Sequence, residues 1–341
     1  MIKRLSILLL ALVPTMLRAQ FPPASCFVGT TAMHADSSAF VAWATGCSVE
    51  RGPKRIDKPN GALASFGEES LALGQPGGTM DVVSLGDGGT ATVTFDSPIY
   101  NGPGPDFAIF ENGLHPDTDS TMTLYFLELG FVEVSSDGEH FFRFPAVTNV
   151  QCEIQLENAD AMDPSLLHNF AGKYEAMYGT PFDLDEVEDN VLLNKNKITH
   201  VRIVDVVGNI DTLYTTDEEG NVTDTIYPTR DSQGHVVNDP WPTAFKSSGF
   251  DLDAVGVIHD LAHNDVTENE DDFVALYPNP VKDRLYVKAE GLQRVEVFNL
   301  VGQKVLASEN ASIDMGSLVQ GVYFVRVTAD GKVATKRIVK Q

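Results

Sequence analysis

The segment Phe-Val-Glu-Val-Ser-Ser-Asp-Gly-Glu-His-Phe-Phe-Arg-Phe, residues 131–144, carries the clearest indication of the fold. Residues 131–134 and 140–144 are rich in the β-branched and aromatic side chains that favour strands. The dipeptide Asp137-Gly138 between them strongly favours a tight hairpin turn. The segment therefore predicts an antiparallel β-hairpin.

The same composition recurs along the chain up to about residue 263. Four further segments are predicted strands bounded by turn residues: 90–95, 106–110, 200–207 and 250–257. Only residues 163–178 and 184–193 leave room for short helices. Many strands joined by long polar loops predict an all-β, jelly-roll sandwich for residues 20–263.

The N-terminus has the pattern of a secretory signal peptide. Lys3 and Arg4 precede an apolar run over residues 5–17, and Arg18-Ala19-Gln20 follows. A short basic start, a brief apolar stretch and a small residue before a polar one are typical of such peptides. We expect cleavage after Ala19, which leaves no transmembrane span in the mature protein.

Charge divides the remaining chain in two. The whole sequence holds 24 Lys+Arg and 48 Asp+Glu, a formal net charge of −24, yet residues 273–341 hold ten basic and six acidic residues. Residues 20–272 are therefore strongly acidic, which disfavours nucleic acid as a partner because its phosphates would be repelled. Residues 264–273 are polar and acidic without periodicity and predict a solvated linker.

The segment after the linker, residues 274–341, predicts a small β-sandwich. Its strand-like runs cover residues 284–287, 294–298, 303–306 and 322–327. Three blocks in this segment closely resemble the type A C-terminal sorting domain of the type IX secretion system of Bacteroidetes. Their distinguishing residues are Pro278, Asn279 and Pro280 in the first block, Val297 to Gln303 in the second, and Gly321, Tyr323, Lys336 and Lys340 in the last.

This resemblance implies an immunoglobulin-like sandwich and an exported protein. It implies recognition by the type IX secretion machinery and removal of the domain by the sorting peptidase of that system. The passenger is then released or attached at the cell surface, on the exterior of the outer membrane. We expect the mature protein to lack the residues after about 270.

Residues 20–263, the passenger, resemble a family of secreted or cell-surface bacterial proteins that often carry such tails. The resemblance lies in residues 83–89, 104–112, 131–138, 178–184 and 250–255. It implies a galactose-binding-like sandwich at the cell surface and brings no established reaction.

Only three cysteines are present, so a single disulfide would leave one thiol over. Cys26 and Cys47 both lie near the N-terminus, and an exported protein can form disulfides. We therefore expect a Cys26–Cys47 disulfide.

Calcium is the cofactor that the acidic composition favours. Ca²⁺ takes six to eight oxygen ligands from carboxylates and carbonyls in loops. A carboxylate in a core strand is costly to bury unless it is paired or bound to metal. The candidate ligands in or beside predicted strands and in the loop 229–242 are Asp205, Asp231, Asp239, Asp251 and Asp253.

The function most consistent with this sequence is non-catalytic binding of an extracellular glycan or small nutrient on a calcium-stabilised sandwich. Trp241 and Tyr227 are the candidate ligand-binding aromatics. No nucleophile motif such as Gly-X-Ser-X-Gly is present. Carboxylate-based enzymes leave no short motif, so a secreted polysaccharide hydrolase or lyase stays an alternative. A structural adhesin or matrix protein is the third possibility.

Overall fold

The computed structural model describes residues 21–58, 61–217, 219–263, 274–299, 303–330 and 332–341. The chain divides into two compact units, residues 1–263 and residues 264–341. The predicted signal peptide, residues 1–19, and the predicted acidic linker, residues 264–273, lie outside the described residues.

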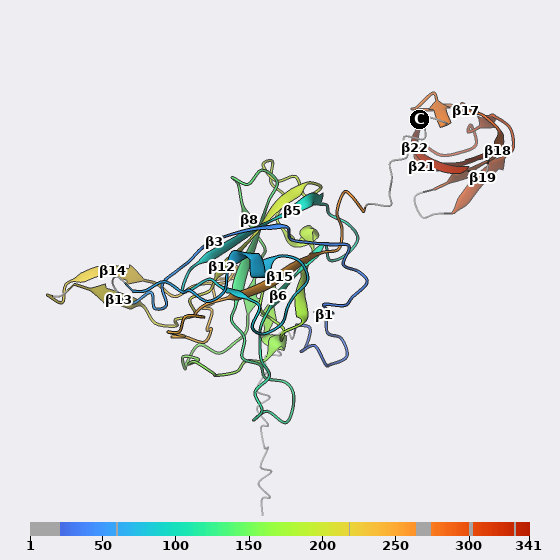
Figure 1. Cartoon of the computed structure of the whole chain (residues 1–341). Helices are drawn as coiled ribbons and strands as arrows, with labels where there is room; N and C mark the ends of the chain where they lie inside the picture. Colours follow the sequence, from blue (N-terminus) through green and yellow to red (C-terminus); the bar gives the residue numbers. More distant parts are fainter. Residues whose placement is uncertain (1–20, 59–60, 218, 264–273, 300–302, 331) are drawn as a thin grey trace, which may run out of the picture. The chain divides into compact units, whose positions relative to one another are not determined.

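The N-terminal unit is all-β and contains two main sheets (Figure 1). The first sheet has the order β1 (Met33–His34), β11 (Tyr178–Phe182), β6 (Phe107–Glu111), β15 (Asp251–Val257) and β2 (Ala42–Trp43), and β4 (Val83–Ser84) also pairs with β15. The second sheet has the order β3 (Gly46–Glu50), β5 (Thr90–Ile99), β12 (Ile198–Asp205), β7 (Gly130–Ser135) and β8 (Phe142–Arg143).

Two small antiparallel pairs complete this unit within the described residues. They are β9 (Val147–Thr148) with β10 (Leu167–His168), and β13 (Leu213–Thr216) with β14 (Val222–Ile226). The β13–β14 pair projects from the two main sheets (Figure 1). The helical content of the described residues is three single 3-10 turns: Glu69–Ala72, Pro164–Leu166 and Leu184–Glu186.

The main core lies between the two sheets. Ile109 of β6 and Val255 of β15 belong to one apolar cluster with Val93 of β5, Val132 of β7 and Ile203 of β12, and all five are essentially inaccessible to solvent. Burying one such side chain contributes about 1.5–3 kcal/mol. Because the cluster draws on both sheets, the two sheets pack face to face.

The strand predictions are confirmed at the hairpin and in the core. β7 pairs with β8 in an antiparallel register that sets Glu133 opposite Arg143, and these two side chains form an ion pair at 2.8 Å. The other predicted core segments fall on β5, β6, β12 and β15. Because β15 is buried along its whole length, it is continuously apolar apart from its two aspartates.

The expected short helices are wrong beyond a single turn. After the 3-10 turn Pro164–Leu166 the chain pairs as β10, and Asn169 and Gly172 then adopt left-handed backbone angles, with φ of 53° and 78°. Left-handed residues interrupt a right-handed helix. Tertiary pairing therefore replaces the local helical preference.

The C-terminal unit consists of two antiparallel sheets. One contains β16 (Val274–Tyr277), β17 (Arg284–Ala289) and β20 (Ser312–Asp314). The other has the order β19 (Lys304–Ser308), β18 (Leu292–Phe298), β21 (Gly321–Ala329) and β22 (Lys332–Lys340). Leu285 and Ile313 of the first sheet share a buried apolar cluster with Val297, Val325 and Ile338 of the second. The unit is therefore a small two-sheet structure with its own core.

The first and last motif blocks of this unit meet in space. The Asn279 side chain accepts a hydrogen bond from the Val339 N–H at 2.9 Å and donates one to the Arg337 carbonyl at 3.2 Å. Gly321 lies opposite Lys340 in the β21–β22 register. Asn279 thus ties the segment that enters the unit to its last strand, although 60 residues separate it from Val339.

We predict that Asn279→Ala loosens β22 without unfolding the N-terminal unit. The variant loses two hydrogen bonds to backbone groups, each worth about 0.5–1.5 kcal/mol. Hydrogen-exchange mass spectrometry of the full chain should show faster exchange across residues 334–340. Asn310→Ala, in an exposed turn of the same unit, is the matched control. Equal exchange in the two variants would contradict this role of Asn279.

Candidate functional site

Buried carboxylates gather where four strands of the N-terminal unit begin or end. Glu111 is the last residue of β6, Glu128 precedes β7, Asp205 is the last residue of β12, and Asp251 is the first residue of β15. Asp239 joins them from the loop 229–242. All five side chains belong to residues that are at most 5% exposed.

The strand register explains why these positions meet. In β15, Leu252 lies opposite Glu111, so Asp251 and Glu111 are close neighbours on adjacent strands. The Phe250 N–H just before β15 donates to Asp205 Oδ1 at 2.7 Å, which joins the end of β12 to the start of β15. The Leu129 N–H donates to Asp239 Oδ2 at 3.3 Å, so the loop acid lies beside the start of β7.

The carboxylates act on one another electrostatically. Burial raises the pKa of Glu111 well above its usual range, and the charge of Asp251 raises it further. Burial likewise raises the pKa of Glu128, with added contributions from Asp251 and Glu111. Burial raises the pKa of Asp205 to about 8. Removal from water and mutual repulsion both disfavour the charged forms of these groups.

Hydrogen bonding separates these acids into two kinds. Both oxygens of Asp205 accept backbone hydrogen bonds, from Gly88 at 2.8 Å and from Phe250. By contrast, Glu111 Oε2, Asp239 Oδ1 and Asp251 Oδ1 are buried and have no hydrogen-bond partner within normal distance among the described residues. The Ser84 hydroxyl, opposite Asp251 on β4, nevertheless acts to lower the pKa of the Asp251 carboxyl. Buried polar atoms without partners are rare in folded proteins and are costly. These three oxygens therefore need a proton, a water molecule or a cation.

A metal held by acids alone does not fit this arrangement. Among the described residues, no three His, Cys, Asp or Glu side chains converge closely enough to hold an ion. A calcium site can contain fewer than three acidic side chains, because backbone carbonyls, amide oxygens and water complete the coordination. Glu111 and Asp251, one residue out of register on paired strands, each carry one of the unpartnered oxygens.

Two of the five predicted metal ligands lie elsewhere and anchor loops. Asp253 accepts backbone hydrogen bonds from Gly77 at 2.8 Å and Gly78 at 3.2 Å. Asp231 accepts them from Gln233 and His235 in its own turn and from Thr148 of β9. The structure thus brings together Asp205, Asp239 and Asp251 and separates Asp231 and Asp253 from them.

Sequence reasoning missed Glu111 and Glu128. Both stand in apolar surroundings, in Ile109-Phe110-Glu111 and Leu127-Glu128-Leu129. The rule that singled out Asp251 and Asp253, an acid within a core segment, applies equally to these two glutamates. Pairing of β6 with β15 could not be deduced from the sequence, so their proximity to Asp251 could not be either.

The two predicted ligand-binding aromatics are in different environments. Trp241 is 8% exposed, and its indole N–H donates to Asp87 Oδ2 at 3.0 Å, so it anchors the loop 229–242. Tyr227 is 74% exposed. A shared stacking platform would need both rings on one accessible surface, and Trp241 is packed inside instead.

The predicted Cys26–Cys47 disulfide is wrong, because Cys26, Cys47 and Cys152 are all free thiols. Cys47 lies in β3 opposite Val93 and packs against the main core. Cys26 is exposed, with its sulfur 3.9 Å from the Tyr125 hydroxyl. Proximity in sequence did not bring the two cysteines together, because strand pairing fixed Cys47 inside the second sheet.

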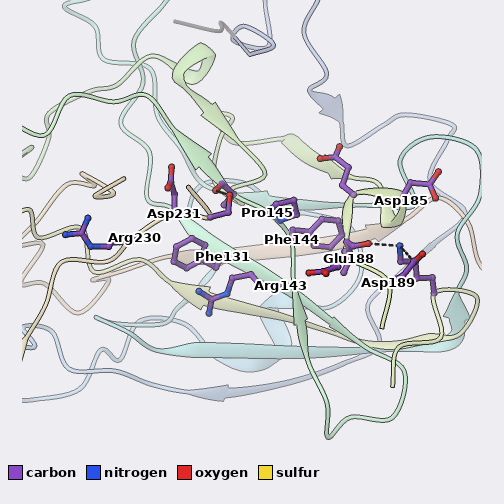
Figure 2. A pocket seen from close by; sticks show the side chains of 14 residues that line it. Phe131, Arg143, Phe144, Pro145, Asp185, Glu188, Asp189, Arg230 and Asp231 are labelled. Carbon is purple, nitrogen blue, oxygen red and sulfur yellow. Dashed lines mark hydrogen bonds and ion pairs between the residues drawn. The ribbon is translucent and has the colours of Figure 1, made fainter. Parts of the chain in front are cut away.

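A groove of about 640 Å³ provides an accessible site on the N-terminal unit (Figure 2). Phe131, Phe144 and Pro145 form its middle, with the Arg143 guanidinium 4.3 Å from the centre of the Phe131 ring. Charged groups stand at its two ends: Arg230 and Asp231 at one, and Asp185, Glu188 and Asp189 at the other. An apolar middle with polar ends is typical of small-ligand sites.

Comparison with known proteins identifies the smaller unit. Residues 275–341 match the family of secretion system C-terminal sorting domains. This segment is a type IX secretion sorting domain. The protein is therefore exported to the cell surface or the extracellular space. Within the described residues, no helix has the length and apolar character needed to cross a membrane.

The remaining comparisons add no assignment for the passenger. No curated protein matches the chain. A β-glucuronidase of Faecalibacterium prausnitzii is similar at 11% identity and a TM-score of 0.18, covering 87% of this chain and 44% of that enzyme. This chain thus corresponds to less than half of the enzyme's length, and so low a TM-score carries no functional argument.

We predict a pH-dependent contribution of Asp87 to stability, because burial raises its pKa to about 6. An unfolded aspartate has a pKa near 3.9. The folded state thus keeps the Asp87 proton up to a higher pH than the unfolded state does. The free energy of unfolding therefore falls as the pH rises from about 4 through 6. This difference in pKa between the folded and unfolded states corresponds to about 3 kcal/mol in the free energy of unfolding.

Asp87→Asn should remove this loss, because the Ile56 N–H and the Trp241 indole N–H both donate to one oxygen, Oδ2, which the amide retains. Urea unfolding in chelator at pH 4 and pH 7.5 should show the variant gaining about 2–3 kcal/mol relative to the parent. Asp224→Asn, at an exposed position in β14, is the control. A pH-independent difference between variant and parent would refute the prediction.

Proposed function

We propose that the exported passenger is a non-catalytic binding protein for an extracellular glycan or small nutrient, stabilised by Ca²⁺. The sandwich that carries it has jelly-roll, galactose-binding-like topology in this proposal. The type IX secretion machinery and its sorting peptidase are the partners that act on residues 275–341 and remove them during export.

The observation that carries this proposal is the set of unpartnered carboxylate oxygens on Glu111, Asp239 and Asp251. Burial, and after it the charges of neighbouring acids, raise the pKa of Glu111 and Asp239, and a cation would favour the charged forms of both. Calcium is the divalent ion that accepts two carboxylates together with carbonyl, amide and water oxygens. Glu111 and Asp251 would be ligands, and Glu128 and Asp239 would add negative charge around the ion.

Burial of the cluster also favours binding over catalysis. The acids with raised pKa values are sealed from solvent and are absent from the lining of the groove in Figure 2. A glycoside hydrolase needs its two carboxyl groups on either side of an accessible sugar. The polysaccharide hydrolase or lyase therefore stays the alternative, and a structural adhesin the third candidate.

We predict that Ca²⁺ raises the melting temperature of the full-length protein at pH 7.5 and that a chelator reverses the change. Calcium at 100 times its Kd stabilises the folded state by about 2.7 kcal/mol. For a unit of this size that corresponds to roughly 5–10 °C. Glu111→Gln and Asp251→Asn should abolish the increase.

Asp231→Asn is the matched control, because Asp231 is similarly buried but accepts backbone hydrogen bonds within its own turn and from Thr148. It should keep the calcium response even if its starting melting temperature is lower. A response that is absent in the parent protein, or that persists in both cluster variants, would remove calcium from the proposal.

We predict that the calcium-loaded protein binds a glycan or nutrient in the groove of Figure 2. A screen of immobilised polysaccharides and small nutrients would identify the ligand class. Glu188→Ala and Arg230→Ala, at opposite ends of the groove, should each weaken binding at least about tenfold, since hydrogen bonds to charged groups contribute about 1.5–3 kcal/mol. The exposed Glu219→Ala is the control. Shortening of a bound polysaccharide would favour the enzyme, and no binding at all would favour the adhesin.

A further inference from the structure

A second cavity shares Glu186 with the groove and is lined by the first described residues of the chain, Phe21 and Pro22. Its volume is about 340 Å³. Phe21, Pro22, Pro105 and Pro181 form its apolar walls. Its polar lining consists of Thr31, His168, Asn169, Lys173, Thr180, Asp183 and Glu186. The cavity thus combines an apolar wall with side chains that bind hydroxyl groups.

Lys173 is the unusual group in this lining. The residue is only 3% exposed, and its Nζ donates a hydrogen bond to the Leu167 carbonyl at 2.9 Å. Among the described residues, the Leu167 carbonyl is the one hydrogen-bond acceptor for Lys173 Nζ. A charged lysine amine has three hydrogens to donate. The Tyr174 ring lies 5.3 Å from Nζ. No carboxylate among the described residues forms an ion pair with Lys173.

The backbone holds this lysine inward. Gly172, just before it, has φ of 78°, and a Cβ atom there would come within 2.0 Å of the Glu128 carbonyl oxygen. Ala171 exchanges two backbone hydrogen bonds with Gly130 of β7. The segment is therefore fixed against the second sheet, and the position of Lys173 is a consequence of the fold rather than of a mobile surface chain.

A histidine–carboxylate pair lines the same cavity. His168 Nε2 is 3.0 Å from Glu186 Oε2, which also accepts a hydrogen bond from Asn169. The Phe21 ring stacks on the His168 ring at 5.1 Å between centroids. His168 is thus oriented on one side by a carboxylate and on the other by an aromatic ring.

Burial lowers the pKa of Lys173 to about 7. An ordinary lysine has a pKa near 10.4 and is almost entirely protonated at neutral pH. Lysines that lose their proton through burial are the ones that act as amine nucleophiles toward carbonyl compounds.

We propose that this cavity binds a small hydroxyl-bearing aldehyde or ketone and that Lys173 reacts with it to form an imine. The neutral amine attacks the carbonyl carbon, a C–N bond forms, and the carbonyl oxygen takes up a proton to give a carbinolamine. The His168–Glu186 pair then protonates that hydroxyl, which leaves as water, and the nitrogen forms the C=N bond and returns its remaining proton to the pair. Amine and carbonyl compound together give imine and water, so no oxidant or reductant is needed.

The test is reductive trapping in the full-length protein. Glyceraldehyde with sodium cyanoborohydride converts an imine into a stable secondary amine, which peptide mass spectrometry locates. At pH 7 we expect Lys173 to be modified at least about tenfold faster than the exposed Lys197 and Lys246, because about half of Lys173 is neutral against roughly one molecule in a few thousand for an ordinary lysine.

The pH profile provides a second readout that a merely buried lysine would not give. The rate at Lys173 should level off above about pH 7.5, whereas the rate at an ordinary lysine, with a pKa near 10.4, keeps rising about tenfold per pH unit over this range. Lys173→Met should lose this modification and keep those at the two exposed lysines. A rate at Lys173 equal to or below theirs, or modification of Lys173 only in denaturant, would overturn the proposal.

Discussion

The burial of carboxylates at the strand ends is the constraint on which the N-terminal unit depends. Facing sheets bury their apolar side chains and, with them, the acids at the ends of β6, β12 and β15. An uncompensated buried charge is among the most costly features that a fold can contain. The protein must therefore neutralise these groups by a proton, by backbone N–H groups or by a cation, and the choice differs from one acid to the next.

The way each acid is neutralised separates acids with a structural role from acids that have an oxygen free to bind a proton, a water molecule or a cation. Asp205, Asp231 and Asp253 accept backbone hydrogen bonds and fix loops or strand ends. Glu111 and Asp251 keep an oxygen that no described group satisfies. The number of hydrogen bonds that each carboxylate accepts thus distinguishes acids that are similarly buried.

In the C-terminal unit, backbone hydrogen bonds join segments that are far apart in the sequence. Its identity as a sorting domain rests on motif blocks that lie far apart in sequence. Asn279 joins the first block to the last strand through two backbone hydrogen bonds, and the β21–β22 pairing sets Gly321 opposite Lys340. The spacing between the motif blocks therefore lets the first block and the last strand meet in the folded two-sheet structure.

The sequence by itself determined the strand content, the sorting domain and the change in charge between the two units, because alternation, turn dipeptides and motif order are local properties of the chain. It also indicated Asp205 and Asp251, since an acid in or beside an apolar strand is visible without a structure, and Asp239 as an acid of the loop 229–242. Only the tertiary structure decided which acids meet, because the pairing of β6 with β15 and the approach of the loop 229–242 join residues more than 100 positions apart. For the same reason it alone placed Cys47 away from Cys26 and enclosed Lys173 in a cavity. Burial and partnership are properties of the packed chain, and they decide the chemistry of each side chain.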